Sequence, residues 1–534
     1  MTLPVVEVQA VSSLHQLAQR LHTEIIEGKI ETIEQLNNRK RELASGLNIK
    51  HLPTNPDLIP LMPVALTAKE RELFSIKPVR NISGVAVLAA MVKPHVCPHG
   101  TCTYCPKGLH HPAPPAYTGD EPAAQRGYRN NFDAYNQITS RIKQLQATGQ
   151  STDKCELIIM GGTFLSMAED YQYEFMQGCL DGITGEHHAN IQESVAACET
   201  SENRVIGITM ETRPDVAKVS DIQRMLTWGT TRVEMGVQSV HDDVLQTLNR
   251  QHTIQTTIDS TQRLKDACLK VGYHMMSKLP GSTLERDLES HLEIFSNPSF
   301  RPDMVKFYPL AVVENTALYP KMMKGEYTPI TQEEAIEFYA TLKPQVPEWV
   351  RIMRVQRDIP AQNISAGVKK TNLRQMVEQR MKENGTVCRC IRCREVGFKR
   401  IKEGKIPQKI EMVRREYEAS HGKEIFLSAE DVEQDILVGF MRLRIPHQPT
   451  LPELNDSAFI RELHVYGQSI PIGGQISASG QHKGWGKQLM AEAERIAKDE
   501  FGLKQMNVIA GIGVREYYRK LGYQQNGAFV RKKL

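Results

Sequence analysis

Three cysteines stand close together in the stretch CPHGTCTYCPKG, residues 97–108, which follows the apolar segment VAVLAAMV (85–92). The chain has 534 residues and ten cysteines, and six of the ten lie in two tight clusters. Thiols grouped in this way favour a metal centre over a disulfide framework in an intracellular protein. The first cluster consists of Cys97, Cys102 and Cys105.

The spacing of this first cluster narrows the choice of metal. Thiolates bind soft metals and iron–sulfur clusters, whereas a closed structural zinc site needs four ligands. Three ligands on one loop, with no obvious fourth beside them, suit a cubane that keeps one iron open to a small molecule. A zinc site completed by His95 or His99, and free thiols, are the alternatives that the spacing leaves.

The region around the first cluster predicts a parallel sheet. Short apolar segments recur with helical stretches between them, and their spacing suits repeated β-α units. The expected strands lie near residues 85–92, 155–162, 204–211, 231–239, 271–281 and 304–310. Six units predict a partial (β/α)6 barrel in an α/β protein, with active residues at the carboxyl ends of the strands. The cysteine loop, MGGTF and METRPD follow the first three strands, where that rule expects them.

The pattern changes along the chain, which is long enough for several domains. We expect four regions: a helical, basic N-terminal region (1–75), the barrel (76–325), a basic linker (326–425) and a smaller α/β domain (426–534). Residues 374–423 carry 14 Lys and Arg against 7 Asp and Glu. Such an excess suits phosphate binding, or else a solvated helical surface.

Composition is that of an ordinary soluble protein, with 40% hydrophobic and 24% charged residues. The N-terminus MTLPVVEVQAV has no secretory pattern. The longest apolar run, GVAVLAAMV, is too short to cross a bilayer. We therefore expect a cytoplasmic protein without a membrane partner.

The second cysteine cluster lies inside the basic linker and comprises Cys388, Cys390 and Cys393. Three thiolates on one short loop favour structural zinc, with a fourth ligand such as histidine from elsewhere in the chain. A second iron–sulfur cluster and a set of redox thiols are the alternatives. A zinc ion here would clamp the linker between the two flanking domains.

The first cysteine loop resembles that of radical S-adenosylmethionine (SAM) enzymes. Tyr104 precedes the last cysteine as in those enzymes, but the first spacing is four residues instead of their usual three. From about residue 75 to the end, the chain resembles the family of Elongator catalytic subunits, in a prokaryotic, stand-alone form. The motifs that carry this resemblance occur in the family's order: IIMGGTF, GITMETRPD, RVEMGVQS, HMMSKLPG, FYPL, VQRDIP, REVG, ELHVYG and YYRKLGY.

The resemblance implies a [4Fe–4S] cluster on the first three cysteines and a SAM site at the strand ends. The implied SAM-binding residues are Gly161, Gly162, Thr163, Glu211 and Gln238. Relatives often have glutamate in place of Thr163. The glycines also suit a simple tight turn, and Glu211 also suits a salt bridge to Arg213. Further polar candidates for the pocket are Lys278 and Lys306.

The C-terminal region resembles the acetyltransferases of the GNAT class. QHKGWGKQLMAEAERIAKDEFG (481–502) has a glycine-rich start that suits pyrophosphate binding at a helix N-terminus. The strand RELHVYG precedes it and VIAGIGVREYYRKLGY follows it, as in that fold. A capped helix without a ligand is the alternative. The implied acetyl-CoA-binding residues are Lys154, Glu462, Leu463, His464, Val465, Gly484, Trp485, Gly486, Lys487, Tyr517 and Tyr518.

Three of these residues have a structural alternative. Tyr517 and Tyr518 also suit core packing, and by composition alone Lys154 is a surface lysine.

The resemblance implies a tRNA-modifying enzyme. A deoxyadenosyl radical would take a hydrogen from the methyl group of acetyl-CoA, the acetyl radical would add to C5 of the wobble uridine at position 34, and thioester hydrolysis would leave a carboxymethyl group. The expected partners are tRNA, acetyl-CoA, an electron donor and a second copy of the chain in a homodimer. The expected tRNA contacts are Lys40, Arg41, Arg389 and Arg392.

Two other functions are consistent with parts of the pattern. A GNAT-type protein lysine acetyltransferase would use the barrel only as an iron–sulfur scaffold, with Glu462 or His464 as a candidate general base. A non-catalytic tRNA-binding module would keep its cofactor sites as relics, against which the intact cysteines argue.

Overall fold

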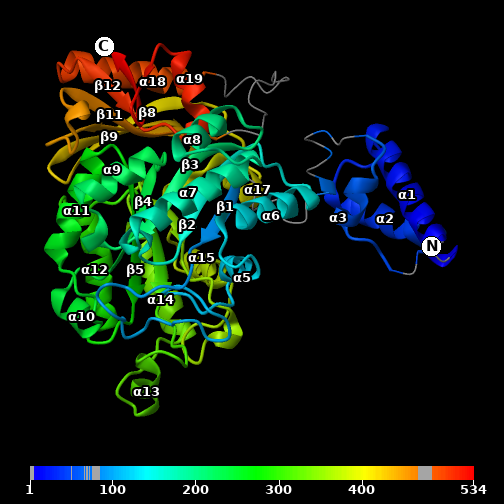
Figure 1. Ribbon diagram of the computed structural model, residues 1–534, viewed down its shortest axis with the longest axis horizontal. Helices are drawn as coiled ribbons and strands as arrows, with labels where there is room; N and C mark the ends of the chain where they lie inside the picture. Colours follow the sequence, from blue (N-terminus) through cyan, green and yellow to red (C-terminus); the bar gives the residue numbers. More distant parts are fainter. Residues whose placement is uncertain are drawn as a thin grey trace.

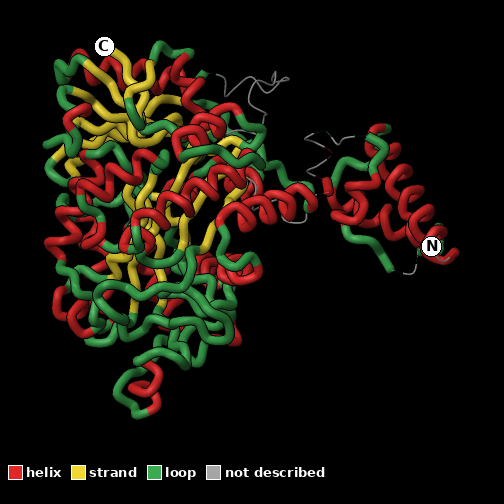
Figure 2. The backbone as a smooth tube through the Cα atoms, viewed as in Figure 1, coloured by secondary structure: helices red, strands yellow, loops and turns green. Residues whose placement is uncertain are grey.

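The computed structural model describes residues 5–49, 51–64, 67, 70, 73–74, 84–466 and 484–534. These residues form a helical N-terminal unit, a parallel sheet with its helices, and a second sheet that carries the C-terminus (Figure 1 and Figure 2). None of the described helices is long and apolar enough to span a membrane.

Seven parallel strands form the first sheet and lie side by side in sequence order. They are β1 (Ala86–Met91), β2 (Lys154–Met160), β3 (Arg204–Thr212), β4 (Arg232–Gln238), β5 (Lys270–Ser277), β6 (Met304–Pro309) and β7 (Arg351–Arg354). The partial barrel of an α/β protein is thereby confirmed. The sequence does not predict β7, because RIMR has only four residues and two of them are arginines.

Helices follow the strands and cover the outside of the sheet (Figure 1). They are α5 (Pro122–Arg129), α6 (Ala134–Ala147), α7 (Glu169–Thr184), α8 (Ile191–Thr200), α9 (Val219–Thr227), α10 (Asp242–Thr247), α11 (Ile254–Asp266), α12 (Leu284–Ser296), α13 (Leu318–Met323) and α14 (Gln332–Leu342). After β7 come α15 (Leu373–Glu383), α16 (Ile391–Arg394) and α17 (Val396–Glu403).

The two faces of the parallel strands differ in chemistry. Leu157 and Ile159 of β2 are fully buried in the main hydrophobic core against the helices. Alternate residues point the other way because side chains change face at every residue of a strand, and on this inner face stand charged residues such as Glu156, Arg232 and Glu234. The interior of the half-barrel is therefore polar rather than filled with apolar side chains.

The second sheet has the strand order β13-β14-β12-β11-β10-β9-β8. Strands β11 and β12 are parallel and the other pairs are antiparallel. The strands are β8 (Glu411–Ala419), β9 (Gly422–Asp431), β10 (Ile436–Ile445), β11 (Ser457–Val465), β12 (Gln505–Val508), β13 (Gln524–Asn526) and β14 (Phe529–Lys533). The accompanying helices are α18 (Trp485–Arg495), α19 (Arg515–Arg519) and the short helix η10 (Ile512–Val514).

Both sheets extend past the expected region boundaries. The parallel sheet continues beyond residue 325 to β7, and the second sheet begins before residue 426, at Glu411. Strand β8 is an edge strand whose residues are mostly exposed or half-buried. Charged side chains are common on such edges, and five of the nine residues of EMVRREYEA are charged, so its composition resembles that of a linker although it forms a strand.

The second sheet packs against the amino ends of the barrel strands. A Cβ on Gly511 would overlap the Ile206 carbonyl, and one on Gly513 would lie 2.6 Å from Arg204. These two glycines therefore allow the segment before α19 to approach the start of β3 closely. Across the same interface, the Arg461 guanidinium lies 2.6 Å from Asp303, which stands just before β6.

The N-terminal unit contains α1 (Val5–Ile26), α2 (Ile33–Gly46), α3 (Asn55–Leu58) and the short helix η1 (Ile59–Leu61). It has its own small core, which includes Leu17, Leu21 and Leu36. It lies on the side of the barrel where α6 is found (Figure 1), and Ile59 approaches Gly149 at the end of α6.

Candidate active site

One large cavity occupies the carboxyl end and interior of the half-barrel. Its volume is about 1510 Å³, which exceeds the ~300–1,000 Å³ that one small ligand usually fills. Its walls include the cysteine loop after β1, the turn after β2 and inner-face residues of all seven strands or of the segments that follow them. The cavity therefore has room for more than one ligand beside the cysteines.

All three cysteines of the first cluster line this cavity. The Cys97 thiol lies 3.2 Å from the Thr163 hydroxyl, and the Cys105 sulfur accepts a hydrogen bond from the Ala116 N–H at 3.1 Å. Burial raises the pKa of the Cys105 thiol to about 12. The three sulfur atoms do not all lie within 4.8 Å of one another. This wider spacing suits a multi-iron cluster better than a single ion.

A buried arginine beside Cys102 supplies the charge that such a cluster needs. Arg250 Nη1 lies 3.6 Å from Cys102 Sγ, while Nη2 donates to the Gly236 carbonyl. Within the described part of the chain, its guanidinium forms no ion pair, and its Nε has no hydrogen-bond partner. Buried charges are costly unless they are paired. Thiolates carrying an iron–sulfur cluster would be the missing counter-charge, so the residues fit this cofactor.

The predicted SAM residues converge on the same cavity. Gly161 has φ +141° and Gly162 has φ +76°, and a Cβ on Gly162 would lie 3.0 Å from the Pro115 carbonyl. The turn thus needs glycine at this point, which agrees with both the turn and the ligand interpretation. Gly162 and Thr163 line the cavity.

Glu211 and Gln238 lie across the cavity at the ends of β3 and β4. Glu211 accepts a hydrogen bond from Tyr117 at 2.7 Å. Arg213, the expected alternative partner of Glu211, instead pairs with Asp215 at 2.9 Å. Gln238 has φ +73°, and among the described residues its buried side-chain carbonyl has no hydrogen-bond partner. Strain and an unsatisfied polar atom at one position are typical of a ligand-binding site.

Charged side chains continue from this site through the barrel interior. Lys306 Nζ lies 3.5 Å from Glu211 and also pairs with Glu234, whose carboxylate accepts from His274 Nε2 at 3.0 Å. Below them, Arg232 pairs with Glu156 at 2.5 Å. These residues form a polar path from the cysteine end of the sheet toward its amino end. Lys278 lies apart from it, since its amino group is 3.5 Å from Glu334 and the residue does not line the cavity.

Strand β11 places the first group of expected acetyl-CoA residues at the amino end of the barrel. Glu462 accepts a hydrogen bond from Arg442 Nε at 2.8 Å, and the His464 ring packs against that of Tyr466 at a tilt of 40°, with 4.3 Å between ring centroids. Burial lowers the pKa of His464 to about 4, and the cations that add to this effect include Lys154. Lys154 of β2 therefore lies near β11, not on an isolated surface. Leu463 and Val465 pack against the core of the second sheet.

The second group of expected acetyl-CoA residues lies at the start of α18. Gly484 has φ +94° and caps the helix, while Trp485 and Gly486 are half-buried and Lys487 is exposed. A Cβ on Gly486 would lie 2.8 Å from the Tyr517 hydroxyl, so that hydroxyl reaches the helix N-terminus. Gln481, the first residue of the glycine motif, lies outside the described residues.

The two adjacent tyrosines have different surroundings. Tyr518 belongs to the core of the second sheet and is only 6% exposed, which agrees with the core-packing alternative. Tyr517 is 37% exposed and packs edge-on against Tyr518. Of the pair, Tyr517 is therefore the one available to a ligand at α18.

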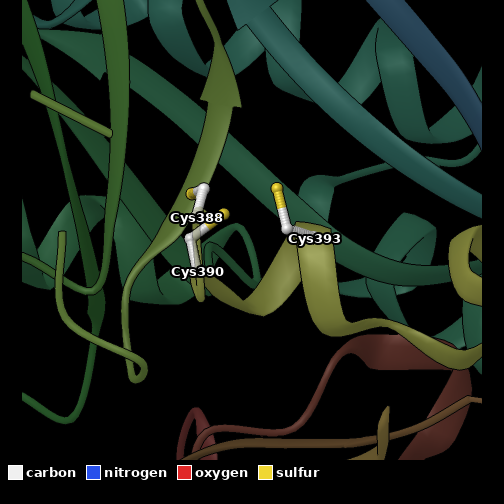
Figure 3. A group of neighbouring side chains, drawn as sticks. All are labelled: Cys388, Cys390 and Cys393. Atoms are coloured by element: carbon white, nitrogen blue, oxygen red, sulfur yellow. The ribbon is translucent and has the colours of Figure 1, made fainter. Parts of the chain in front are cut away.

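The second cysteine cluster lies beside β7, away from the large cavity. The sulfur atoms of Cys388, Cys390 and Cys393 all lie within 4.8 Å of one another, and Figure 3 shows the three side chains on one short segment at the start of α16. Thiolates this close repel one another unless a cation holds them. Among the described residues, no fourth histidine, cysteine or carboxylate joins this group.

The expected tRNA contacts differ in availability. Lys40 is a correction: it is 6% exposed, and its amino group donates to Asn55 Oδ1 at 2.6 Å inside the N-terminal unit. It faces inward because α2 turns that side of the helix onto α3. Arg41 is exposed. Arg389 pairs with Asp435 at 2.9 Å, and Arg392 lies over the Phe398 ring, so both are already engaged within the chain.

Several residues of the site are not among the sequence-based candidates. Arg250 and Tyr117 come from segments without a recognised motif, whereas the inner-face residues leave a readable signal. In β4, charged residues such as Arg232 and Glu234 alternate with apolar ones, and in β5 His274 stands on the same face as Lys270. Parallel strands buried on both faces are normally apolar throughout, so this alternation indicates a polar barrel interior.

Comparison with known proteins agrees with this geometry. Residues 91–293 match the model of the Radical SAM superfamily, and residues 302–383 match the Radical_SAM C-terminal domain. A tRNA uridine(34) acetyltransferase of Methanocaldococcus jannaschii is 50% identical over 86% of this chain and 86% of that protein. Elongator complex protein 3 of Homo sapiens is 42% identical over 96% of both chains.

The similarity extends to a solved structure. The structure of an archaeal Elp3 from Methanocaldococcus infernus, with an N-terminal deletion (1-46), has a TM-score of 0.75 and 45% identity. The match covers 85% of this chain and all of that one.

The half-barrel with its cysteine loop defines a radical SAM protein, a class whose cofactors are a [4Fe–4S] cluster and SAM. Within that class, the chain belongs to the family of tRNA uridine(34) acetyltransferases and Elongator complex protein 3.

Proposed function

We propose that this protein modifies the wobble uridine of tRNA and uses acetyl-CoA to place a carboxymethyl group on C5. Relatives that match almost the whole chain are named for the uridine at position 34 of tRNA. The observation that carries the proposal is the large cavity beside the three cysteines, together with the charged path that leads from it toward β11. One chain thus offers both a radical site and a second site for an acyl donor.

The residues at the carboxyl end would hold SAM and the uridine. When bound, a [4Fe–4S] cluster with SAM supplies an organic radical that removes hydrogen from an unactivated carbon. The strained turn at Gly161 and Gly162 would present backbone groups to the methionine part of SAM, with Thr163 beside it. Glu211 would accept from a ribose hydroxyl, and the unpartnered Gln238 carbonyl would accept from a further donor.

The residues at the amino end would hold acetyl-CoA. The unpaired N–H groups at the start of α18 would bind the pyrophosphate, and Gly484, Trp485, Gly486 and Lys487 would frame it. Glu462, His464 and Lys154 would surround the acyl end. Because a seven-residue strand such as β2 spans about 23 Å, the acyl group must enter the barrel interior to meet the radical site, past the pair formed by Glu156 and Arg232.

Structural zinc is proposed for the second cysteine cluster. The buried Lys343, whose amino group lies 3.8 Å from a Glu378 oxygen, is close enough to Cys393 to act electrostatically on its thiol. It would balance the negative charge that three thiolates leave on a bound zinc ion. We expect elemental analysis to find zinc in addition to iron. Cys390→Ser should remove the zinc alone, and Cys97→Ala should lower the iron content alone; zinc unchanged in Cys390→Ser would exclude this site.

The remaining partners are also proposals. A one-electron donor must reduce the cluster, and a tRNA substrate is consistent with a cytoplasmic protein. The homodimer stays a prediction, which light scattering of the purified protein would check.

The function is tested by product analysis. Iron would be reconstituted anaerobically, and reductant, SAM, acetyl-CoA and unmodified tRNA would then be added. We expect mass spectrometry to find 5-carboxymethyluridine and 5′-deoxyadenosine, and neither product with Cys102→Ala. Deoxyadenosine without modified tRNA, with all cofactors confirmed bound, would contradict the proposed substrate.

The alternative, protein lysine acetylation, is not favoured. It leaves the cysteine-lined cavity without a purpose, and relatives that match almost the whole chain are named for tRNA. It predicts that Cys102→Ala keeps full acetyl transfer, whereas the tRNA proposal predicts that damage at Cys102 or at Gly486 removes the same product.

A further inference from the structure

One wall at the mouth of the large cavity is positively charged. This wall comes from α5, α6 and the residues after them, and we call it the arginine wall; its long side chains are Gln125, Arg126, Arg129, Arg141 and Gln144. None of the cavity-lining residues between 122 and 150 is an Asp or Glu. The wall therefore presents three positive charges to the cavity mouth. The cavity-lining acids next to it in sequence, Asp120 and Glu121, stand just before α5 and are engaged with His110 and with the Thr118 N–H.

Two of these arginines form no ion pair within the described chain. Arg126 donates from Nη2 to the Ala89 carbonyl at 2.7 Å, and its Nε is buried without a hydrogen-bond partner. Burial, with Arg141 nearby, lowers the pKa of Arg126 to about 10. Arg129 is exposed and donates to Gln125 at 3.1 Å. Guanidinium groups held close together in this way are well placed to bind an anion such as phosphate.

An aromatic pair stands next to the arginine wall. Tyr128 of α5 is 43% exposed, and its ring stacks on that of His111 with 4.8 Å between the centroids and 27° between the planes. The His111 side chain is 38% exposed. An exposed ring that is already held by a stacked neighbour gives an unpaired base a rigid platform at little cost in side-chain entropy.

We propose that the arginine wall and the Tyr128–His111 pair dock the single-stranded loop of an RNA. The arginines would bind the phosphates that flank the target nucleotide, and the aromatic pair would stack a neighbouring base. The target base could then turn into the cavity toward the cysteines. A single-stranded loop is favoured over a duplex because only unpaired bases are free to stack on protein rings. This inference rests on the proposed function, which supplies the RNA substrate.

The test measures RNA affinity by fluorescence anisotropy between about 50 and 200 mM salt. The probe is a labelled RNA hairpin with the anticodon stem and loop of a tRNA that has uridine at position 34. For each phosphate contact to a single strand, the slope of log affinity against log salt is about 0.7. Arg129→Ala should therefore reduce the slope by about 0.7.

A matched control lies on the same surface region. Lys143 is an exposed cation of α6 that does not line the cavity, and Lys143→Ala should leave the slope unchanged. Tyr128→Ala should weaken hairpin binding by about 5- to 150-fold, the range for one stacked base. Tyr128→Phe keeps the ring and should bind like the unaltered protein. Iron content and circular dichroism would confirm that each variant is folded.

Each outcome decides one question. Suppose that the unaltered protein binds the hairpin, and that Arg129→Ala and Tyr128→Ala both bind it as tightly as Lys143→Ala does. The RNA then does not dock on this surface, while the proposed function stands. If blunt duplex RNA binds as tightly as the hairpin and Tyr128→Ala does not weaken it, a single-stranded loop is not the occupant. If the unaltered protein binds no RNA, the proposed function fails, and this surface with it.

Discussion

The buried polar groups at the carboxyl end of the half-barrel differ from those at its amino end in whether they are paired with one another. At the carboxyl end, Gln238 has a strained backbone, and within the part of the chain that the structure describes its side-chain carbonyl has no hydrogen-bond partner and the buried Arg250 forms no ion pair. At the amino end, Asp303 and Glu424 share the Arg461 guanidinium, each within 2.7 Å. Buried polar groups are therefore left unpaired where ligands are expected to bind, and form ion pairs with one another where the two sheets pack together.

The largest expected effect is at the carboxyl end, where a substitution should abolish product formation but leave the free energy of unfolding nearly unchanged. Cys102→Ala should abolish product formation, because it removes one of three cluster ligands. The free energy of unfolding of the metal-free protein should change by about 1 kcal/mol or less, since the buried Cys102 side chain also lines the cavity and the variant loses only one sulfur atom. Product assays and urea unfolding of the metal-free chain would show both results. A large loss of stability in Cys102→Ala would mean that polar groups at the carboxyl end of the half-barrel stabilise the fold as those at the amino end do.

Removing one partner of the buried pairs should have the reverse effect at the amino end. Arg461→Met removes the cation nearest to both Asp303 and Glu424, although Lys265 stays within 3.8 Å of each, and this loss should cost about 3–5 kcal/mol in the free energy of unfolding. Urea denaturation would measure this loss. As a control, Arg286→Ala breaks a solvent-exposed pair with Asp243 and should leave the free energy of unfolding almost unchanged. Equal costs for the two variants would contradict the comparison.

The amino end should also respond to acid through His464. Burial lowers the pKa of His464 to about 4, so the folded chain keeps this ring neutral while the unfolded chain takes up a proton below its ordinary pKa of 6.5. The unfolded state thus binds more protons between these two values, and stability falls as the pH drops through them. At about pH 5 the loss should be about 2 kcal/mol relative to neutral pH.

His464→Phe should remove this part of the pH dependence. Unfolding free energies of both proteins at neutral pH and at about pH 5 would reveal the difference. A pH profile that is the same with and without the imidazole would show that His464 already carries a proton in the folded state.

The smallest expected effect concerns the unpaired arginine beside Cys102. A positive charge and an N–H group near a cluster thiolate favour the reduced, more negative state. Arg250→Gln should therefore lower the reduction potential of the reconstituted cluster by about 60 mV, which equals about 1.4 kcal/mol for one electron. A spectroscopic redox titration at unchanged iron content would measure it. An unaltered potential would mean that Arg250 serves only to hold the loop.

Much of the fold follows from local pattern. The six strands expected at residues 85–310 all exist, because buried apolar segments of that length separated by helical stretches have few other stable arrangements. Strands β7 and β8 are missed for the opposite reason: one is very short and the other is a charged edge, so neither carries the apolar signal. Gly511 and Gly513 were expected within an acetyl-CoA fold, yet their close contacts are with β3 of the barrel.

The sequence by itself determined which chemistry the chain carries. The cysteine spacing, the glycine turn after the second strand and the glycine-rich helix start are local features, and each depends on residues within a few positions of one another. Only the tertiary structure decided how these features relate. It buried Lys40, brought Arg250 from a distant loop to Cys102, and placed the two expected cofactor sites at opposite ends of one polar barrel. Contacts between residues far apart in sequence depend on packing across elements, which no short motif encodes.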